Sequence, residues 1–99
     1  MLRHIVMWKL KDGQDKAAVG LELKRRLETL PALIPEIKAF QVGLNIVASD
    51  TARDVVLESS FDDLAAMDRY VKHPAHQEVA AYIKQVVDER RAVDYETGE

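Results

Sequence analysis

The chain has 99 residues, of which 47% are hydrophobic and 31% are charged, and this length predicts a single compact domain over residues 1–99. It has no cysteine, which excludes disulfides and thiolate metal sites and leads us to expect a cytoplasmic location. The net charge of -3 is mild and basic residues alternate with acidic ones, so we expect no nucleic-acid partner. No apolar stretch is long enough to span a bilayer, and we expect no membrane association.

The first half of the chain predicts a strand, a helix and a second strand. Residues 2–10 are rich in Ile, Val and Trp and precede a turn signal, which is typical of a strand. Residues 15–30 carry apolar side chains at helical spacing, and Pro31 is expected to end that helix. Residues 37–46 alternate between apolar and other side chains up to Ile46, which predicts a strand.

The second half predicts a strand, two helices and a last strand. The strand ends at Phe61, and Asp62 is a suitable N-cap for the helix that follows. The inner face of that helix is expected to consist of Leu64, Met67 and Val71. Pro74 suits the first position of a further helix, which makes His73 its expected N-cap. Residues 90–96 alternate and predict a short final strand.

The order of these elements indicates the fold class. It is the α+β, ferredoxin-like β-α-β-β-α-β pattern, with a four-stranded antiparallel sheet and helices on one face. The other sheet face then has no cover, although Ile5 and Met7 of the central first strand point toward it. A monomer rarely exposes an apolar patch of this kind. We therefore expect a homodimer formed through the open sheet face.

Four side chains are predicted to gather between the sheet and the helices. His76 shares a helix face with the apolar residues three, four and seven positions after it, so it should point into the core. His4 lies on the strand face that also carries Trp8, and Tyr70 borders the inner stripe of the preceding helix. The two imidazoles and the phenol are therefore expected to converge. The alternative is that both histidines are core residues that hydrogen-bond to backbone carbonyls.

The spacing of His73 and His76 does not favour a metal site. If Pro74 begins the helix, the two side chains point in different directions and cannot chelate as histidines four residues apart on one helix do. We therefore expect no metal ligands in this sequence.

Three segments of the sequence resemble one protein family. The N-terminal "RHIVMWKLKDG", the mid-chain "VGLN", and "YVKHPAHQEV" followed by "VDYE" are similar to the stress-responsive α/β barrel domain family of the dimeric α/β barrel superfamily. The resemblance covers nearly the whole chain. It implies a dimeric α/β barrel, in which two four-stranded sheets pack face to face with the helices outside.

The resemblance also implies candidate chemistry. A polyketide cyclase branch of the family performs an intramolecular aldol condensation with the histidine and tyrosine positions that match His4, Tyr70 and His76, without a cofactor. We expect the chain to bind a small organic ligand at His4, Trp8, Tyr70 and His76, with no metal or organic cofactor. One alternative is a cofactor-independent cyclase or lyase that uses His4 and His76 as acid and base. Another is a non-catalytic structural or assembly role under stress.

Overall fold

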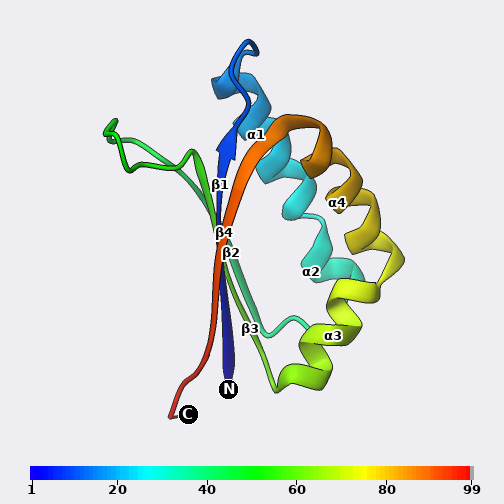
Figure 1. The fold of residues 1–99 in the computed structure, drawn as a ribbon. Helices are drawn as coiled ribbons and strands as arrows, with labels where there is room; N and C mark the ends of the chain where they lie inside the picture. The colour runs from blue at the N-terminus through cyan, green and yellow to red at the C-terminus, as the bar shows by residue number, and fades with distance from the viewer. Residues whose placement is uncertain (99) are drawn as a thin grey trace.

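The computed structural model describes residues 1–98, which form one antiparallel sheet with helices on one of its faces (Figure 1). The strands are β1 (Leu2–Leu10), β2 (Ala39–Leu44), β3 (Val55–Phe61) and β4 (Val87–Glu96). The helices are α1 (Lys16–Leu27), α2 (Leu30–Leu33), α3 (Leu64–Lys72) and α4 (Pro74–Val86). The strand order β2-β3-β1-β4 makes β1 central and confirms the ferredoxin-like fold.

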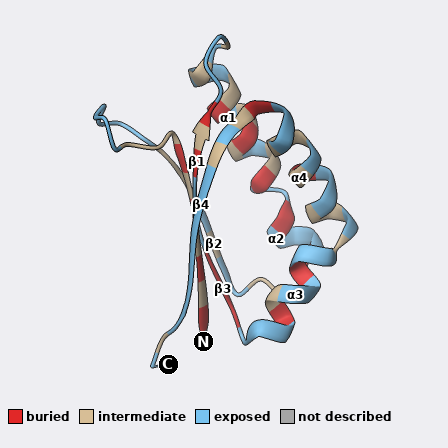
Figure 2. Ribbon diagram, in the orientation of Figure 1, coloured by how far each residue is buried: buried red, intermediate tan, exposed pale blue. Residues whose placement is uncertain are grey.

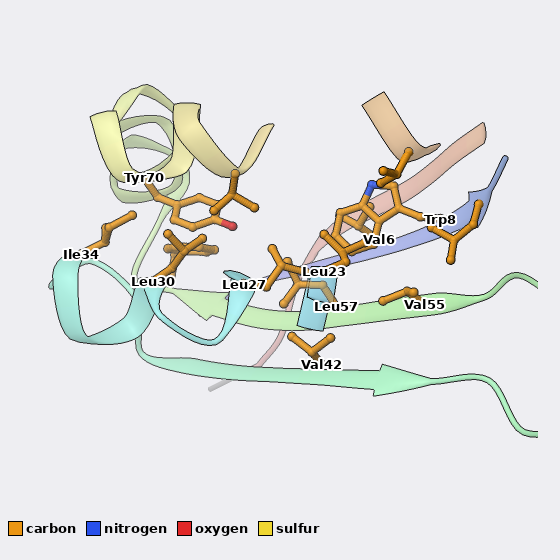
Figure 3. Packing of buried hydrophobic residues seen from close by; sticks show 14 of the residues in the cluster. Val6, Trp8, Leu23, Leu27, Leu30, Ile34, Val42, Val55, Leu57 and Tyr70 are labelled. Atoms are coloured by element: carbon orange, nitrogen blue, oxygen red, sulfur yellow. The ribbon is translucent and has the colours of Figure 1, made fainter. Parts of the chain in front are cut away.

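The hydrophobic core lies between the sheet and the helices. Figure 2 shows the buried residues on β1 and β3 and on the sides of the helices that face them. Alternate residues of β1 supply the sheet side of the core, namely Leu2, Val6, Trp8 and Leu10. Leu23 and Leu27 of α1 and Leu30 of α2 pack against this layer (Figure 3). Each such fully buried leucine stabilises the fold by about 1.5–3 kcal/mol.

The start of α4 agrees with the sequence prediction, whereas the start of α3 does not. His73 is the N-cap of α4, where its Nδ1 accepts a hydrogen bond from Ala75 N–H at 3.0 Å. The N-cap of α3 is Asp63 rather than Asp62, and its carboxylate accepts from Ala66 N–H at 2.8 Å. The predicted cap was therefore one residue too early.

The inner face of α3 also differs from the prediction. Ala66 and Tyr70 are its buried residues, and Met67 is half-buried. Leu64 and Val71 are exposed by 62% and 38%, so their predicted place in the core was wrong. The physical reason is that hydrophobicity alone does not fix the rotation of a short helix, whereas the large Tyr70 ring fills the space under α3.

Three element boundaries also differ from the predictions. The helix predicted over residues 15–30 ends at Leu27, and Pro31 lies in the first turn of α2, where a missing N–H is tolerated. β2 ends at Leu44, so Ile46 lies in the following loop and is 94% exposed. β4 begins at Val87, directly after α4. Within the described residues, no helix has the length and hydropathy needed to cross a membrane.

The second face of the sheet has no helix over it (Figure 1). Met7 of β1 is exposed by 42%, and Val93 and Tyr95 of β4 by 61% and 46%. Ile5 pairs with Val93 and Met7 lies two residues further along β1, so these apolar side chains share one face. The uncovered apolar face expected from the sequence is present.

Candidate functional site

A cavity of about 310 Å³ lies between the sheet and helices α3 and α4. The four predicted site residues line it: His4 and Trp8 from β1, Tyr70 from α3 and His76 from α4. Apolar side chains form most of the remaining wall, namely Val6, Leu27, Leu57, Val71, Ala80 and Ile83. The volume is at the lower end of the range found for small-molecule sites.

Tyr70 is the centre of an aromatic cluster at one end of the cavity. Its ring centroid lies 4.6 Å from that of His76, in an edge-to-face arrangement, and 4.8 Å from that of Phe61. The ring of His4 lies 6.4 Å from Tyr70, also edge to face. The two imidazoles therefore converge on the phenol, as the strand alternation and the helix face predicted.

His4 is oriented by a carboxylate on the neighbouring strand. The β1–β4 register places His4 directly opposite Asp94, and His4 Nδ1 forms a hydrogen bond with Asp94 Oδ1. The His4 side chain is 8% exposed and that of Asp94 is 37% exposed. Because a carboxylate only accepts hydrogen bonds, Nδ1 carries the proton in this pair. The other nitrogen of His4, Nε2, is then the one that can accept a proton.

Burial keeps the two other polar rings neutral. It lowers the pKa of His76, with smaller contributions in the same direction from His4 and Arg90, while the Val71 backbone carbonyl acts in the opposite direction. Burial also raises the pKa of the Tyr70 phenol well above its usual value. At neutral pH the site therefore contains an uncharged imidazole beside a protonated phenol.

Two buried nitrogens of the site have no hydrogen-bond partner within residues 1–98. They are Trp8 Nε1 and His76 Nδ1. Figure 3 shows the hydroxyl of Tyr70 on the side of its ring that faces Trp8. A buried polar group without a partner costs about 1–3 kcal/mol. Both atoms belong to side chains that line the cavity, and each is itself shielded from solvent.

Sequence reasoning missed the residues that β4 contributes. Asp94 holds His4, and Arg90 lines the cavity together with Lys84 of α4. The alternation of residues 90–96 indicates that Arg90 and Asp94 share a face, which is a usable signal. Only the β1–β4 register shows that this face is the one that carries His4 and Trp8.

His73 lies apart from this site. Its ring caps α4, whereas the ring of His76 contacts Tyr70. The two histidines do not form a chelating pair, in agreement with the expected divergence. No group of three or more potential metal ligands occurs among residues 1–98.

Comparisons with known proteins identify the family of the chain. Residues 2–97 match the model of the Stress responsive A/B Barrel Domain. The Streptomyces coelicolor protein SCO4036 is 35% identical over 81 residues, which cover 78% of this chain and 80% of that protein. The stress-response A/B barrel domain-containing protein HS1 of Arabidopsis thaliana is 28% identical over 96 residues, covering 95% and 87% of the two chains.

Solved structures agree with this match. A dimeric ferredoxin-like protein from Bacteroides fragilis superposes with a TM-score of 0.87 at 33% identity, covering 97% of this chain and 95% of that one. A dimeric ferredoxin-like protein from Thermobifida fusca gives 0.85 at 26% identity, covering 95% and 88%. A hydroxynitrile lyase from Passiflora edulis shares the fold at 18% identity, with a TM-score of 0.82 and coverage of 95% and 90%. The chain belongs to the stress-responsive A/B barrel domain family.

Proposed function

We propose that this protein binds a small organic molecule in the cavity at His4, Trp8, Tyr70 and His76. The observation that carries the proposal is the pair of buried nitrogens without partners, Trp8 Nε1 and His76 Nδ1, on two side chains that line one cavity. The large majority of buried side-chain polar atoms in folded proteins have a hydrogen-bond partner, so two atoms without one on the same cavity lining call for an explanation. A ligand that supplies the missing partners accounts for their presence.

The lining defines which ligands fit. The Trp8 N–H only donates, so it selects an acceptor such as a carbonyl or hydroxyl oxygen. The Tyr70 hydroxyl and the neutral His76 ring can each donate or accept. The walls are apolar and aromatic, which favours a ligand with a planar or aliphatic body.

Trp8 also supplies the test, because it is the only tryptophan in the chain. Its indole N–H gives a single signal in a ¹H–¹⁵N spectrum, so this signal reports the cavity directly. Aromatic and polyketide-like compounds would be screened by thermal shift and then titrated against this signal. We expect compounds that stabilise the protein to move the indole signal. We also expect His76→Gln to weaken the binding of these compounds.

The control is His73→Asn. His73 lies three residues before His76, caps α4 and is not part of the cavity lining. It should leave binding unchanged, because Asn caps helices well. Stabilising compounds that leave the indole signal in place would contradict the proposed site. If no compound binds at all, the structural or assembly role becomes the better explanation.

The His4–Asp94 pair and the neutral His76 favour one catalytic extension of this function, a cofactor-independent cyclase or lyase. A neutral imidazole can remove a proton from a carbon next to a carbonyl, while the Tyr70 phenol donates a hydrogen bond to the enolate oxygen. In an aldol condensation, the enolate carbon then attacks a second carbonyl and the resulting alkoxide takes a proton from the imidazolium. His4, held by Asp94, is the second acid or base.

This extension is tested by deuterium exchange at the carbon next to the carbonyl of phenylacetone, followed by NMR in D₂O. We expect the protein to accelerate exchange, and both His76→Gln and Tyr70→Phe to slow it. Exchange no faster than that caused by the same concentration of free imidazole, with phenylacetone bound in the cavity, would exclude acid–base catalysis on this ketone.

We further propose that two copies associate through the open sheet face. The support is the exposed apolar row Met7, Val93 and Tyr95, together with the dimeric relatives of the same fold. The helices and the cavity lie on the opposite side of the sheet, so this association leaves the ligand site accessible.

A further inference from the structure

Two cations line the cavity without acidic partners. Lys84 projects from α4 and Arg90 from β4, and both are exposed residues. Within residues 1–98 neither forms an ion pair, whereas Arg69 pairs with Glu36 at 3.0 Å and Lys24 with Glu28 at 2.8 Å. The chain has a net charge of -3, so a general excess of basic residues does not explain the unpaired cations.

The position of Arg90 directs its charge toward the cavity. It pairs with Trp8 in the β1–β4 register, on the sheet face that the helices cover. Its positive charge acts on the interior: it partly opposes the rise that burial causes in the pKa of Tyr70, and it adds a small part to the fall that burial causes in the pKa of His76. Arg90 is therefore close enough to interact with a ligand that contacts those two rings.

No negative charge in the lining balances these cations. The residues that line the cavity include no aspartate or glutamate, and the nearby Asp94 is engaged by His4. At neutral pH, Tyr70 and His76 are uncharged. The site thus combines an apolar interior, neutral hydrogen-bonding groups and an unpaired guanidinium.

Building on the function proposed above, we propose that the ligand is an organic carboxylate whose acid group binds Arg90, assisted by Lys84, with its apolar body in the cavity. The planar guanidinium suits bidentate contact with a carboxylate. The apolar walls and the volume of about 310 Å³ favour a monoanion with a sizeable hydrocarbon body over a free inorganic anion.

A matched pair of probes tests this inference on the full chain. Naphthalene-2-carboxylate and naphthalene-2-carboxamide have the same aromatic body and differ in charge. Both would be titrated by calorimetry, with the Trp8 indole signal as the reporter of the site. We expect the carboxylate to bind about 10-fold more tightly than the carboxamide, as is typical for a charge-assisted contact.

Variants then assign the effect to Arg90. Arg90→Gln should lower the affinity for the carboxylate about 10-fold and leave the affinity for the carboxamide nearly unchanged. Lys84→Gln should have a smaller effect in the same direction. Lys11→Gln removes an equal charge from an exposed residue outside the cavity lining and should change neither affinity. Added NaCl should weaken the binding of the carboxylate and leave that of the carboxamide unchanged.

The outcomes separate this inference from the proposed function. If the two probes bind equally, or Arg90→Gln weakens both equally, the anion inference is overturned while ligand binding in the cavity stands. The same holds if neither probe binds but screened neutral compounds move the Trp8 signal. If nothing moves the Trp8 signal, both proposals fail.

Discussion

Replacing His76 with leucine is expected to leave the protein as stable as before or to stabilise it. His76 Nδ1 is buried without a hydrogen-bond partner, so the change leaves no Nδ1 partner unsatisfied. It sacrifices the edge-to-face contact with Tyr70, worth about 0.5–1.5 kcal/mol. It also removes the desolvated nitrogen, which costs the folded state about 1–3 kcal/mol. The difference between these two terms runs from about −0.5 to about +2.5 kcal/mol, so the free energy of unfolding should stay within about 0.5 kcal/mol of the parent value or rise.

His4→Leu is the matched comparison, because it should destabilise. The change removes the hydrogen bond to Asp94, whose carboxylate is partly exposed and can regain water. We expect a loss near the lower end of about 1–3 kcal/mol, or about 4–8 °C in melting temperature. The two variants should thus shift the melting temperature in opposite directions, or His76→Leu should not shift it.

The assay is thermal unfolding followed by circular dichroism, at equal chain concentrations, because the melting temperature of a dimer depends on concentration. The Trp8 indole signal would show that each variant keeps the fold. If His76→Leu lowers the melting temperature by about 8 °C or more, His76 is a satisfied core residue and the argument from its unpartnered nitrogen is wrong.

Three further predictions concern pH, association and helix capping. Burial lowers the pKa of folded His76 below its ordinary value of 6.5, so the unfolded chain binds the extra proton more readily and stability falls as the pH drops below that value. The stability of His76→Leu should fall less steeply over this pH range, because leucine binds no proton. Parallel profiles of stability against pH for the parent and the variant would contradict this prediction. Met7→Glu should convert the dimer into a monomer of 11.2 kDa, as measured by sedimentation equilibrium, because a charge in an apolar interface costs several kcal/mol. The control Leu64→Glu, on the outside of α3, should leave the dimer intact. A Met7→Glu variant that remains dimeric would rule out the open sheet face as the interface. In urea unfolding, His73→Asn should change stability by less than about 0.5 kcal/mol and His73→Ala should lose about 1 kcal/mol, and equal losses would show that capping is not the role of His73.

The strand signals of the fold and the cap of α4 were readable because they are local. Alternation along β1 places Leu2, Val6 and Trp8 on one face whatever the rest of the chain does. Pro74 restricts the conformation of His73 and suits the first helical position, which locates the start of α4. These features depend on neighbours within a few residues.

The rotation of α3 was not readable, because two adjacent aspartates can both serve as its cap. A shift of one residue in the start of a helix carries no hydrophobic signal of its own. Tyr70 and Ala66 occupy the inner face because the tyrosine ring packs against Phe61 and His76, which come from β3 and α4. Contacts between distant elements thus decided what local periodicity left open.

The site followed the same division between local and distant information. The convergence of His4 and His76 could be predicted from one strand face and one helix face. The roles of Asp94 and Arg90 could not, because they depend on the pairing of β4 with β1 across most of the chain. Alternation along a strand indicates which residues share a face. Only the register with the neighbouring strand shows which side of the sheet that face belongs to.

The pairing of β1 with β4 joins the first and last strands of the chain. β1 is synthesised before both strands that flank it in the sheet. The partner of His4, Asp94, lies 90 residues later in the chain. Until β4 docks, one edge of β1 is unpaired and the wall of the cavity that carries Arg90 is missing. Long-range strand pairing of this kind is slow and leaves open edges exposed to aggregation. A ligand that bridges α4 and β4 would hold this last strand in place, so its binding would stabilise the docked strand.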